Sequence, residues 1–253
     1  MKLKVFGTGS KGNAYAWIVG RDVLLLDAGL PWKTIIEGLD DGLRGVCGCL
    51  VTHEHKDHSK AVPDMLKYGI KTVMSDGTAK AISPPTPDTS VKPVQARIRA
   101  VNGEPIHLLN FAIVPFTTQH DAAQPLGYLV KHKPTGATLV YATDTYYLKY
   151  TFPGVNYWLI ECNYTMKLAN KLLEDESGKS LYDRLMKSHM SLDRLLEVFR
   201  VNDLSQTRTI VLIHMSDERS NEAEMVEAVY RQTSIRTIAA KNGQEIDFEY
   251  CPF

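Results

Sequence analysis

The sequence predicts a mixed α/β (α+β) fold in which helices pack outside a two-sheet core. Short apolar runs rich in β-branched residues alternate with helical patterns in both halves of the chain. The chain has 253 residues, of which 44% are hydrophobic, which is enough to bury a sizeable core. We therefore expect residues 1–253 to form a single domain.

The N-terminal half alternates strand and helix signals. Two apolar runs are separated by Gly20-Arg21-Asp22, which is typical of a hairpin. Pro31 suits the first turn of a helix. In chain order, we expect strands at 2–6, 14–19, 23–26 and 46–52 and helices at 32–39 and 59–68.

The rest of the chain continues this alternation. Residues 83–93 (SPPTPDTSVKP) carry four prolines and predict a surface loop. We expect strands at 94–101, 105–109, 111–118, 126–131, 137–142, 158–161, 209–213 and 244–249, and helices at 165–175, 191–201 and 220–231.

Charge and cysteine usage narrow the class of protein. Twenty-nine basic and 29 acidic residues give a net charge of zero, so no general attraction to nucleic acid or anionic membrane is expected. The N-terminus breaks at Gly7 after a short apolar run, unlike a signal peptide, and no apolar stretch approaches the ~18–20 residues that span a bilayer. The four cysteines predict reduced thiols in a cytoplasmic protein: Cys47, Cys49, Cys162 and Cys251.

Residues 7–12 (GTGSKG) match the G-x-G-x-x-G pattern of dinucleotide sites. That site needs a helix directly after the glycines, whereas here a hairpin follows, so a dinucleotide site is disfavoured. Two interpretations stay open. The loop presents Ser10, Lys11 and Asn13 to a substrate phosphate, or its glycines serve only a tight turn.

Residues 52–59 (THEHKDHS) carry three histidines and an aspartate within six positions, just past an apolar strand. In an extended segment, residues i and i+2 share one side, so His53 and His55 can bind one ion. After the chain turns, Asp57 and His58 can reach a second ion. An exposed polar turn with incidental histidines is the disfavoured alternative.

Three further residues follow predicted strands: His120, Asp144 and His214. A lone histidine after a strand is more often structural than a ligand. Together, three such residues at strand ends favour a metal site, in which the carboxylate of Asp144 bridges two cations.

The order of Asp27 (in LLLDAG), the 53–58 cluster, His120, Asp144 and His214 resembles the five signature motifs of the metallo-β-lactamase superfamily. The resemblance covers nearly the whole chain. It implies a four-layer αββα sandwich with the site at the sheet edge.

The resemblance also implies a dinuclear centre. One metal would be held by His53, His55 and His120, and the other by Asp57, His58 and His214. Asp144 would bridge the two, and Asp27 would orient the histidine loop. Histidine and carboxylate ligands favour Zn²⁺, with Mn²⁺ or Fe tolerated.

Several segments are similar to the YycJ-like (WalJ-like) branch of the superfamily, which is associated with DNA exonuclease activity: 9–13 (GSKGN), 120–128, 142–145, 159–163 (LIECN) and 188–191 (SHMS). Asp144 disfavours a β-lactam substrate, because true β-lactamases of this fold generally lack a bridging aspartate. Glu161 and His189 match the glutamate and histidine of the ribonuclease Z proton relay. The alternatives for these two are a strand-end surface charge and a polar residue entering a helix.

Two departures concern substrate recognition. Only 70 positions separate Asp144 from His214, too few for the inserted domain of β-CASP nucleases, and no long basic arm of the ribonuclease Z kind is present. The basic residues Lys167, Lys171, Lys179, Arg184 and Lys187 alternate with Glu174, Asp175, Glu176 and Asp183. A solvated mixed-charge face is therefore favoured over a basic rim.

The leading hypothesis is a dinuclear metal-dependent phosphodiesterase, a nuclease acting on DNA or RNA ends. Two cations would lower the pKa of a shared water toward about 7 and supply a metal-bound hydroxide. Asp57 would orient it, and His189, helped by Glu161, would protonate the departing oxygen. The alternatives are a thioester or lactone hydrolase of the glyoxalase II type and a non-catalytic metal-binding module.

Overall fold

The computed structural model describes residues 1–82, 96–174, 176–216 and 219–249. The chain divides into two compact units. The first comprises Met1–Thr117, Ala122–Gly136 and Lys241–Phe253, and the second Thr118–Asp121 and Ala137–Ala240. The predicted proline-rich loop at 83–93 and Cys251 lie outside the described residues. That the two units form one domain stays a prediction.

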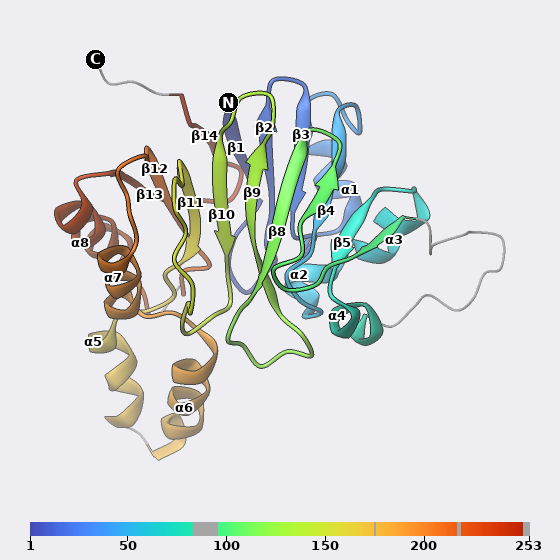
Figure 1. The fold of residues 1–253 in the computed structure, drawn as a ribbon. Helices are drawn as coiled ribbons and strands as arrows, with labels where there is room; N and C mark the ends of the chain where they lie inside the picture. The colour runs from blue at the N-terminus through green and yellow to red at the C-terminus, as the bar shows by residue number, and fades with distance from the viewer. Residues whose placement is uncertain (83–95, 175, 217–218, 250–253) are drawn as a thin grey trace. The chain divides into compact units, whose positions relative to one another are not determined.

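The first unit contains a seven-stranded sheet of order β14-β1-β2-β3-β4-β5-β6 (Figure 1). Its strands are β1 (Lys2–Gly7), β2 (Ala14–Val19), β3 (Asp22–Leu26), β4 (Val46–Leu50), β5 (Thr72–Met74), β6 (Arg97–Arg99) and β14 (Glu245–Asp247). The β2–β3 hairpin is antiparallel, and β3 to β6 run parallel. The N-terminal strands and the hairpin are confirmed, and β5 is a short strand that was not predicted.

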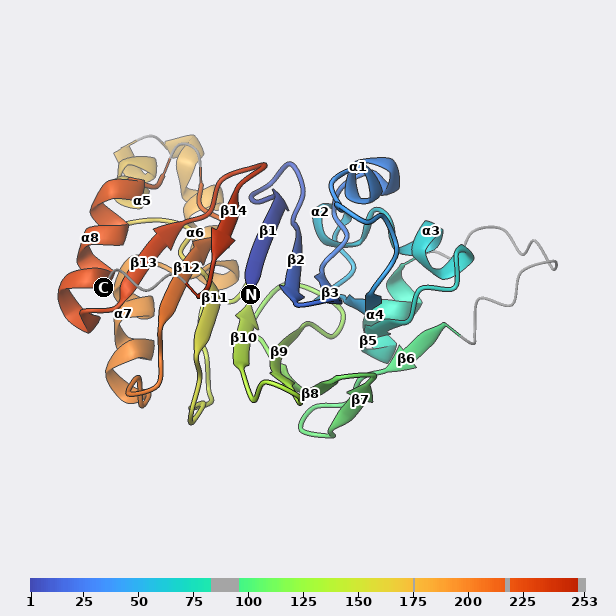
Figure 2. The ribbon, with the colours of Figure 1, turned by 90° about the horizontal axis from the view of Figure 1, so that it is seen from above.

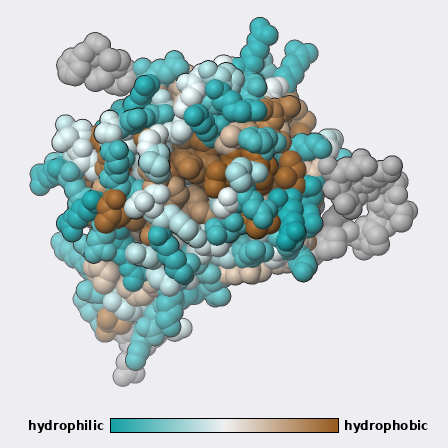
Figure 3. Space-filling view, in the orientation of Figure 1, coloured by the Kyte–Doolittle hydropathy of each residue, from teal (hydrophilic) through white to brown (hydrophobic). Residues whose placement is uncertain are grey.

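A second ladder of the first unit is antiparallel. It consists of β7 (Ile106–Leu108), β8 (Phe111–Thr117) and β9 (Leu126–His132). Phe111 and Ile113 are buried on one face of β8, whereas Val114 faces the other side, where it pairs with Leu129. Figure 3 shows hydrophobic side chains gathered over β8 and β9.

Four short helices belong to the first unit: α1 (Trp32–Glu37), α2 (Lys56–Ser59), α3 (Val62–Lys67) and α4 (Asp76–Ala81). Trp32 of α1 and Met65 of α3 share a buried cluster with Leu25 of β3. In Figure 2, α1 and α3 lie along the outer side of β3 to β5. The helix predicted at 59–68 is divided because Pro63, in the first turn of α3, has no N–H with which to continue α2.

The second unit is built on a parallel sheet of β10 (Thr138–Ala142), β11 (Tyr157–Glu161), β12 (Thr209–Ile213) and β13 (Arg236–Ala239). Every residue of β11 and β12 is buried, as expected of parallel strands covered on both faces. Helices α7 (Leu192–Val201) and α8 (Glu222–Thr233) lie beside these strands (Figures 1 and 2).

In the second unit, the segment between β11 and α7 is mainly helical. It contains α5 (Met166–Ala169), the 3₁₀ turns η2 (Asn170–Glu174) and η3 (Glu176–Gly178), and α6 (Lys179–Ser188). Its small core is formed by Tyr164, Ala169 and Leu185. The predicted helix at 165–175 is thus α only in its first turn, and α6 was not predicted. Among the described residues, no helix is long and apolar enough to cross a membrane.

Three strand ends share an unusual backbone conformation. Asp27 follows β3, Asp144 lies two residues after β10, and His214 follows β12, with φ angles of 56°, 47° and 52°. A left-handed conformation is uncommon for residues other than glycine, and its cost of about 1–3 kcal/mol is typical of functional sites. All three belong to the residues that the sequence singles out.

Candidate metal centre

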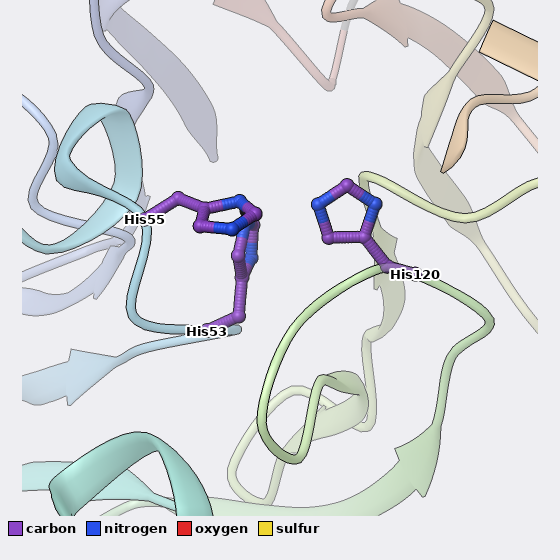
Figure 4. A group of neighbouring side chains, drawn as sticks. All are labelled: His53, His55 and His120. Carbon is purple, nitrogen blue, oxygen red and sulfur yellow. Dashed lines mark hydrogen bonds between the residues drawn. The ribbon is translucent and has the colours of Figure 1, made fainter. Parts of the chain in front are cut away.

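The histidine loop of the first unit, residues 52–59, follows β4. His53 Nε2 and His55 Nδ1 lie 3.0 Å apart. Their rings meet edge to face with centroids 4.6 Å apart. Figure 4 shows these two rings on the loop after β4, with His120 drawn on the loop after β8. The alternation of residues i and i+2 therefore places two imidazole nitrogens at one point, as a shared cation requires.

Asp27 determines which nitrogens of this loop carry hydrogens. Its carboxylate accepts hydrogen bonds from Thr52 N (2.7 Å) and Thr52 Oγ1 (2.9 Å), and from His58 Nδ1 (2.7 Å). Because the Thr52 hydroxyl donates to Asp27, it accepts from His53 Nδ1 at 3.0 Å. Both histidines then keep a lone pair on Nε2, the form that binds a metal.

The turn at Asp57 and His58 is packed against the residues that follow β3. Asn13 N donates to Asp57 O (2.7 Å), and Ala28 N donates to His58 O (2.8 Å). A Cβ on Gly29 would lie 1.7 Å from Asp57 O, so only glycine fits there. Within this turn, His58 Nε2 lies 3.5 Å from Asp57 Oδ2.

The three residues of the glycine-rich loop that were predicted to contact a substrate phosphate differ in their exposure. Asn13 is fully buried, and its amide bonds Gly9 N and Gly9 O and contacts His58 Nε2 at 3.1 Å. Ser10 and Lys11 are exposed. Asn13 is thus part of the support of the histidine loop, whereas Ser10 and Lys11 are accessible to a ligand.

In the second unit, Asp144 lies between two histidines. Its Oδ2 is 3.6 Å from His120 Nε2, and its Oδ1 is 3.6 Å from His214 Nδ1. His120 Nδ1 donates to the carbonyl of Ser188 at 3.0 Å, which leaves the lone pair of Nε2 on the side of Asp144. Each oxygen of one carboxylate therefore faces a different imidazole.

Glu161, at the end of β11, is fully buried and is not a surface charge. Its Oε1 accepts from His189 Nδ1 at 2.6 Å and lies 3.2 Å from His214 Nδ1. Its Oε2 accepts from Thr145 N (2.9 Å) and Met190 N (3.3 Å). The carboxylate is thus held at four points beside the candidate ligands.

Three pKa shifts follow from this arrangement. Burial alone would raise the pKa of Glu161, but the charge and hydrogen bond of His189 bring it below its usual value. Burial opposes protonation of His189 as well, yet Glu161 raises the pKa of His189 above its usual value. Burial lowers the pKa of His120 more than Asp144 and Glu161 raise it. His189 is therefore the imidazole that favours a proton, and His120 favours the neutral, ligating form.

The structure brings the sequence-predicted residues together within each unit. The first unit gathers His53, His55, Asp57 and His58 around the Asp27 support. In the second unit, Asp144, Glu161, His189 and His214 each offer a ligand atom, and these atoms lie within 4.8 Å of one another. His120 adjoins this group through Asp144.

Several supporting groups were not predicted. Asn163 Nδ2 donates to His214 O at 2.7 Å and holds the histidine at the end of β12. Thr145 and the carbonyl of Ser188 hold Glu161 and His120. Their signal in the sequence is weak, because a backbone carbonyl can come from any residue and polar residues after a strand are common.

The donor set fits divalent metal ions. Two ligands of one tetrahedral zinc, each at about 2.0–2.2 Å, are about 3.4 Å apart. The separations given above for the pairs His58–Asp57, His120–Asp144 and His214–Asp144 are 3.5, 3.6 and 3.6 Å. These spacings suit shared cations rather than direct hydrogen bonds, which are shorter.

Comparison with known proteins identifies the family. The model of the β-lactamase superfamily domain matches residues 17–215. The exodeoxyribonuclease WalJ of Streptococcus pneumoniae is 26% identical, over 98% of this chain and 92% of its own. The metallo-β-lactamase fold protein YhfI of Bacillus subtilis superposes with a TM-score of 0.72 at 16% identity, covering 97% and 98% of the two chains. Human tRNase Z, short form, superposes with a TM-score of 0.67 at 14% identity, covering 99% and 100%.

These findings confirm the predicted resemblance and the αββα fold. The family match covers well over half of the chain, and the histidine and carboxylate clusters suit divalent metal ions. The chain therefore belongs to the β-lactamase superfamily and is a metal-dependent hydrolase of the metallo-β-lactamase fold.

Proposed function

We propose that the protein is a dinuclear metal-dependent phosphodiesterase, a nuclease that acts on DNA or RNA ends. The observation that carries the proposal is Asp144, whose two oxygens each lie 3.6 Å from a different histidine. A carboxylate in this position would suit two cations, the arrangement that stabilises charge during hydrolysis of a phosphodiester. The names of the relatives, an exodeoxyribonuclease and a tRNase Z, support the same class of substrate.

One metal would be held by His53, His55 and His120, and the other by Asp57, His58 and His214, with Asp144 as a shared ligand. Zinc is the preferred metal for imidazole and carboxylate donors, and Mn²⁺ or Fe are the alternatives. When bound, two such ions lower the pKa of water and stabilise negative charge on a phosphoryl oxygen.

The chain's own residues supply orientation and proton transfer. Asp57 positions the attacking water and accepts its proton. His189 donates its Nδ1–H to Glu161 at 2.6 Å, which directs Nε2 toward the leaving oxygen. Because Glu161 raises the pKa of His189, the imidazole holds a proton to donate up to a higher pH than an ordinary histidine does. Ser10 and Lys11, exposed on the glycine-rich loop, contact a substrate phosphate.

The described cysteines, Cys47, Cys49 and Cys162, are buried free thiols. Burial raises the pKa of all three, so they are unreactive. Free thiols of this kind support a cytoplasmic location.

The proposal is tested by turnover with zinc-loaded protein. We expect hydrolysis of bis(p-nitrophenyl) phosphate and of labelled single-stranded DNA or RNA, and loss of both in Asp57→Asn, with the circular dichroism spectrum of the folded protein retained. Asp40→Asn, an exposed aspartate that pairs only with lysines, is the matched control and should keep full activity. Turnover of a thioester substrate alone would replace the proposal with a glyoxalase II-type hydrolase. Bound metal without any turnover would identify a non-catalytic module.

A further inference from the structure

An exposed aromatic ring lies three residues after Asp144. Tyr147 has 49% of its surface exposed, whereas Thr145, two positions earlier, is fully buried. A tyrosine offers a flat π face and loses little conformational entropy when another ring stacks on it. An exposed ring beside a phosphodiesterase site is a suitable platform for an unpaired base.

The backbone that carries Tyr147 is fixed to the site. Thr145 Oγ1 donates to Tyr147 O at 2.7 Å and accepts from Gln119 N at 2.9 Å. Tyr146 N donates to Gln119 O at 3.2 Å. Because Gln119 directly precedes His120, the backbone that carries Tyr147 is held close in the chain to two candidate ligands, Asp144 and His120.

Arg194 joins this segment to α6. Its Nη1 donates to Tyr146 O (3.1 Å) and to Met186 O in the last turn of α6 (3.0 Å). Its guanidinium lies 5.2 Å from the centre of the Tyr146 ring, within range of a cation–π interaction. Helix α6 also reaches the site at its end, where Ser188 O accepts from His120 Nδ1. The segment that carries Tyr147 and the end of α6 are therefore both hydrogen-bonded to the loop that carries His120.

The exposed face of α6 is mainly basic. Lys179, Arg184 and Lys187 are exposed together with Asp183, whereas Leu185 is buried on the opposite side. In the part of the chain that the structure describes, none of the three cations makes an ion pair. On α6 itself, the face thus carries three cations against one carboxylate.

Resting on the proposed phosphodiesterase function, we propose that Tyr147 and the basic face of α6 bind a single-stranded nucleic acid. Tyr147 stacks on an unpaired base next to the scissile phosphate. Lys179, Arg184 and Lys187 contact the phosphates that follow along the strand. Stacking needs an unpaired base, so the surface prefers a single strand or a frayed end to a closed duplex.

The test is fluorescence anisotropy with a short labelled single-stranded DNA, in an Asp57→Asn background that prevents cleavage. Tyr147→Ala should weaken binding by roughly fivefold to a hundredfold, and Tyr147→Phe should bind like the parent. Tyr230→Ala is the matched control, because Tyr230 is 51% exposed on α8. A blunt duplex should bind more weakly than the single strand, and Tyr147→Ala should not affect its binding.

The contribution of the basic face of α6 is measured from the salt dependence of binding. Replacing Lys179, Arg184 and Lys187 together by glutamine should lower the slope of log K against log salt by about 2, since each phosphate contact on a single strand contributes roughly 0.7. Arg200→Gln, an exposed cation on α7, should leave the slope unchanged. Thermal melting of each variant confirms that it is folded.

The outcomes separate this inference from the proposed function. If the wild type cleaves oligonucleotides while Tyr147→Ala and the triple variant bind like the parent, the binding surface is wrong and the nuclease stands. Equal loss in Tyr147→Ala and Tyr230→Ala likewise overturns it. If the wild type neither binds nor cleaves oligonucleotides, the proposed function fails, and this inference fails with it.

Discussion

The two units present their candidate ligands in contrasting ways. The first carries four of them within six residues of one loop, supported by the single carboxylate of Asp27. The second takes its ligands from three strand ends, from His120 to His214, 94 positions apart, and supports them with backbone groups and the buried Glu161. A local loop can be recognised from spacing alone, whereas a dispersed site depends on the sheet that brings strand ends together.

The largest expected effect comes from the second unit. Asp144→Asn replaces a bridging carboxylate with a neutral amide while keeping its size. We expect phosphodiester turnover to fall by about 10³-fold or more, because several kcal/mol of charge stabilisation is lost. Metal analysis should show fewer than two ions per chain. An Asp144→Asn variant with two tightly bound ions and full turnover would show that Asp144 is not a shared ligand of two metal ions.

The next effect tests how closely the first unit is packed. In Gly29→Ala, the added Cβ meets Asp57 O at 1.7 Å, so the turn that carries Asp57 and His58 must move. We expect a loss of ~3 kcal/mol in the free energy of unfolding, measured by urea denaturation, together with weaker zinc binding. Gly42→Ala is the control, because a Cβ there meets nothing within 4 Å and only its positive φ adds strain. Equal stabilities of the two variants would contradict the close packing.

A third prediction concerns the proton on His189. The raised pKa of His189 keeps the imidazole protonated to a higher pH, and activity that needs this proton is lost as the pH rises through that value. Glu161→Gln removes the cause of the shift, so the alkaline limb of the kcat profile should move to lower pH. The rate near neutral pH should fall by roughly 10²-fold. An unchanged profile would leave His189 without a role as an acid.

The smallest expected effect is on zinc affinity and tests whether Asp27 supports the histidine loop. Asp27→Asn keeps the shape of the side chain but exchanges an acceptor for a donor, so the hydrogens on His53 and His58 are no longer fixed. We expect zinc affinity to fall by about 10–100-fold in a competition titration, with little change in the melting temperature. Asp64→Asn, on α3 of the same unit, should bind zinc like the wild type. If zinc affinity were unaltered in Asp27→Asn, the loop would be held by its backbone alone.

Much of the architecture follows from residue patterns. The strands at 14–19, 23–26 and 209–213 are continuous apolar runs, and the structure contains them at nearly the same bounds. Helix α6 was missed because only Leu185 and Ser188 of its residues are buried, so its sequence shows no clear apolar face. Between α2 and α3, Ala61 N also donates to Ala28 O, two residues after β3, and spacing does not reveal such a contact.

The candidate site divides in the same way. The residues of the histidine loop follow from their spacing, and His120, Asp144 and His214 follow from strand ends combined with a family resemblance. The linkage from Asp27 through Thr52 to His53 does not follow, because it requires the three-dimensional contact of two strand ends. The positive φ angles of Asp27, Asp144 and His214 are likewise a property of the backbone that only the structure shows.

The central proposal is that the candidate ligands hold two metal ions, and the most direct measurement is a crystal structure of the zinc-loaded protein with anomalous data at the zinc edge. The account predicts two anomalous peaks about 3.5–4 Å apart, one on each side of Asp144. His53, His55 and His120 should surround one peak, and Asp57, His58 and His214 the other. A single peak, or two peaks that do not flank Asp144, would contradict the account.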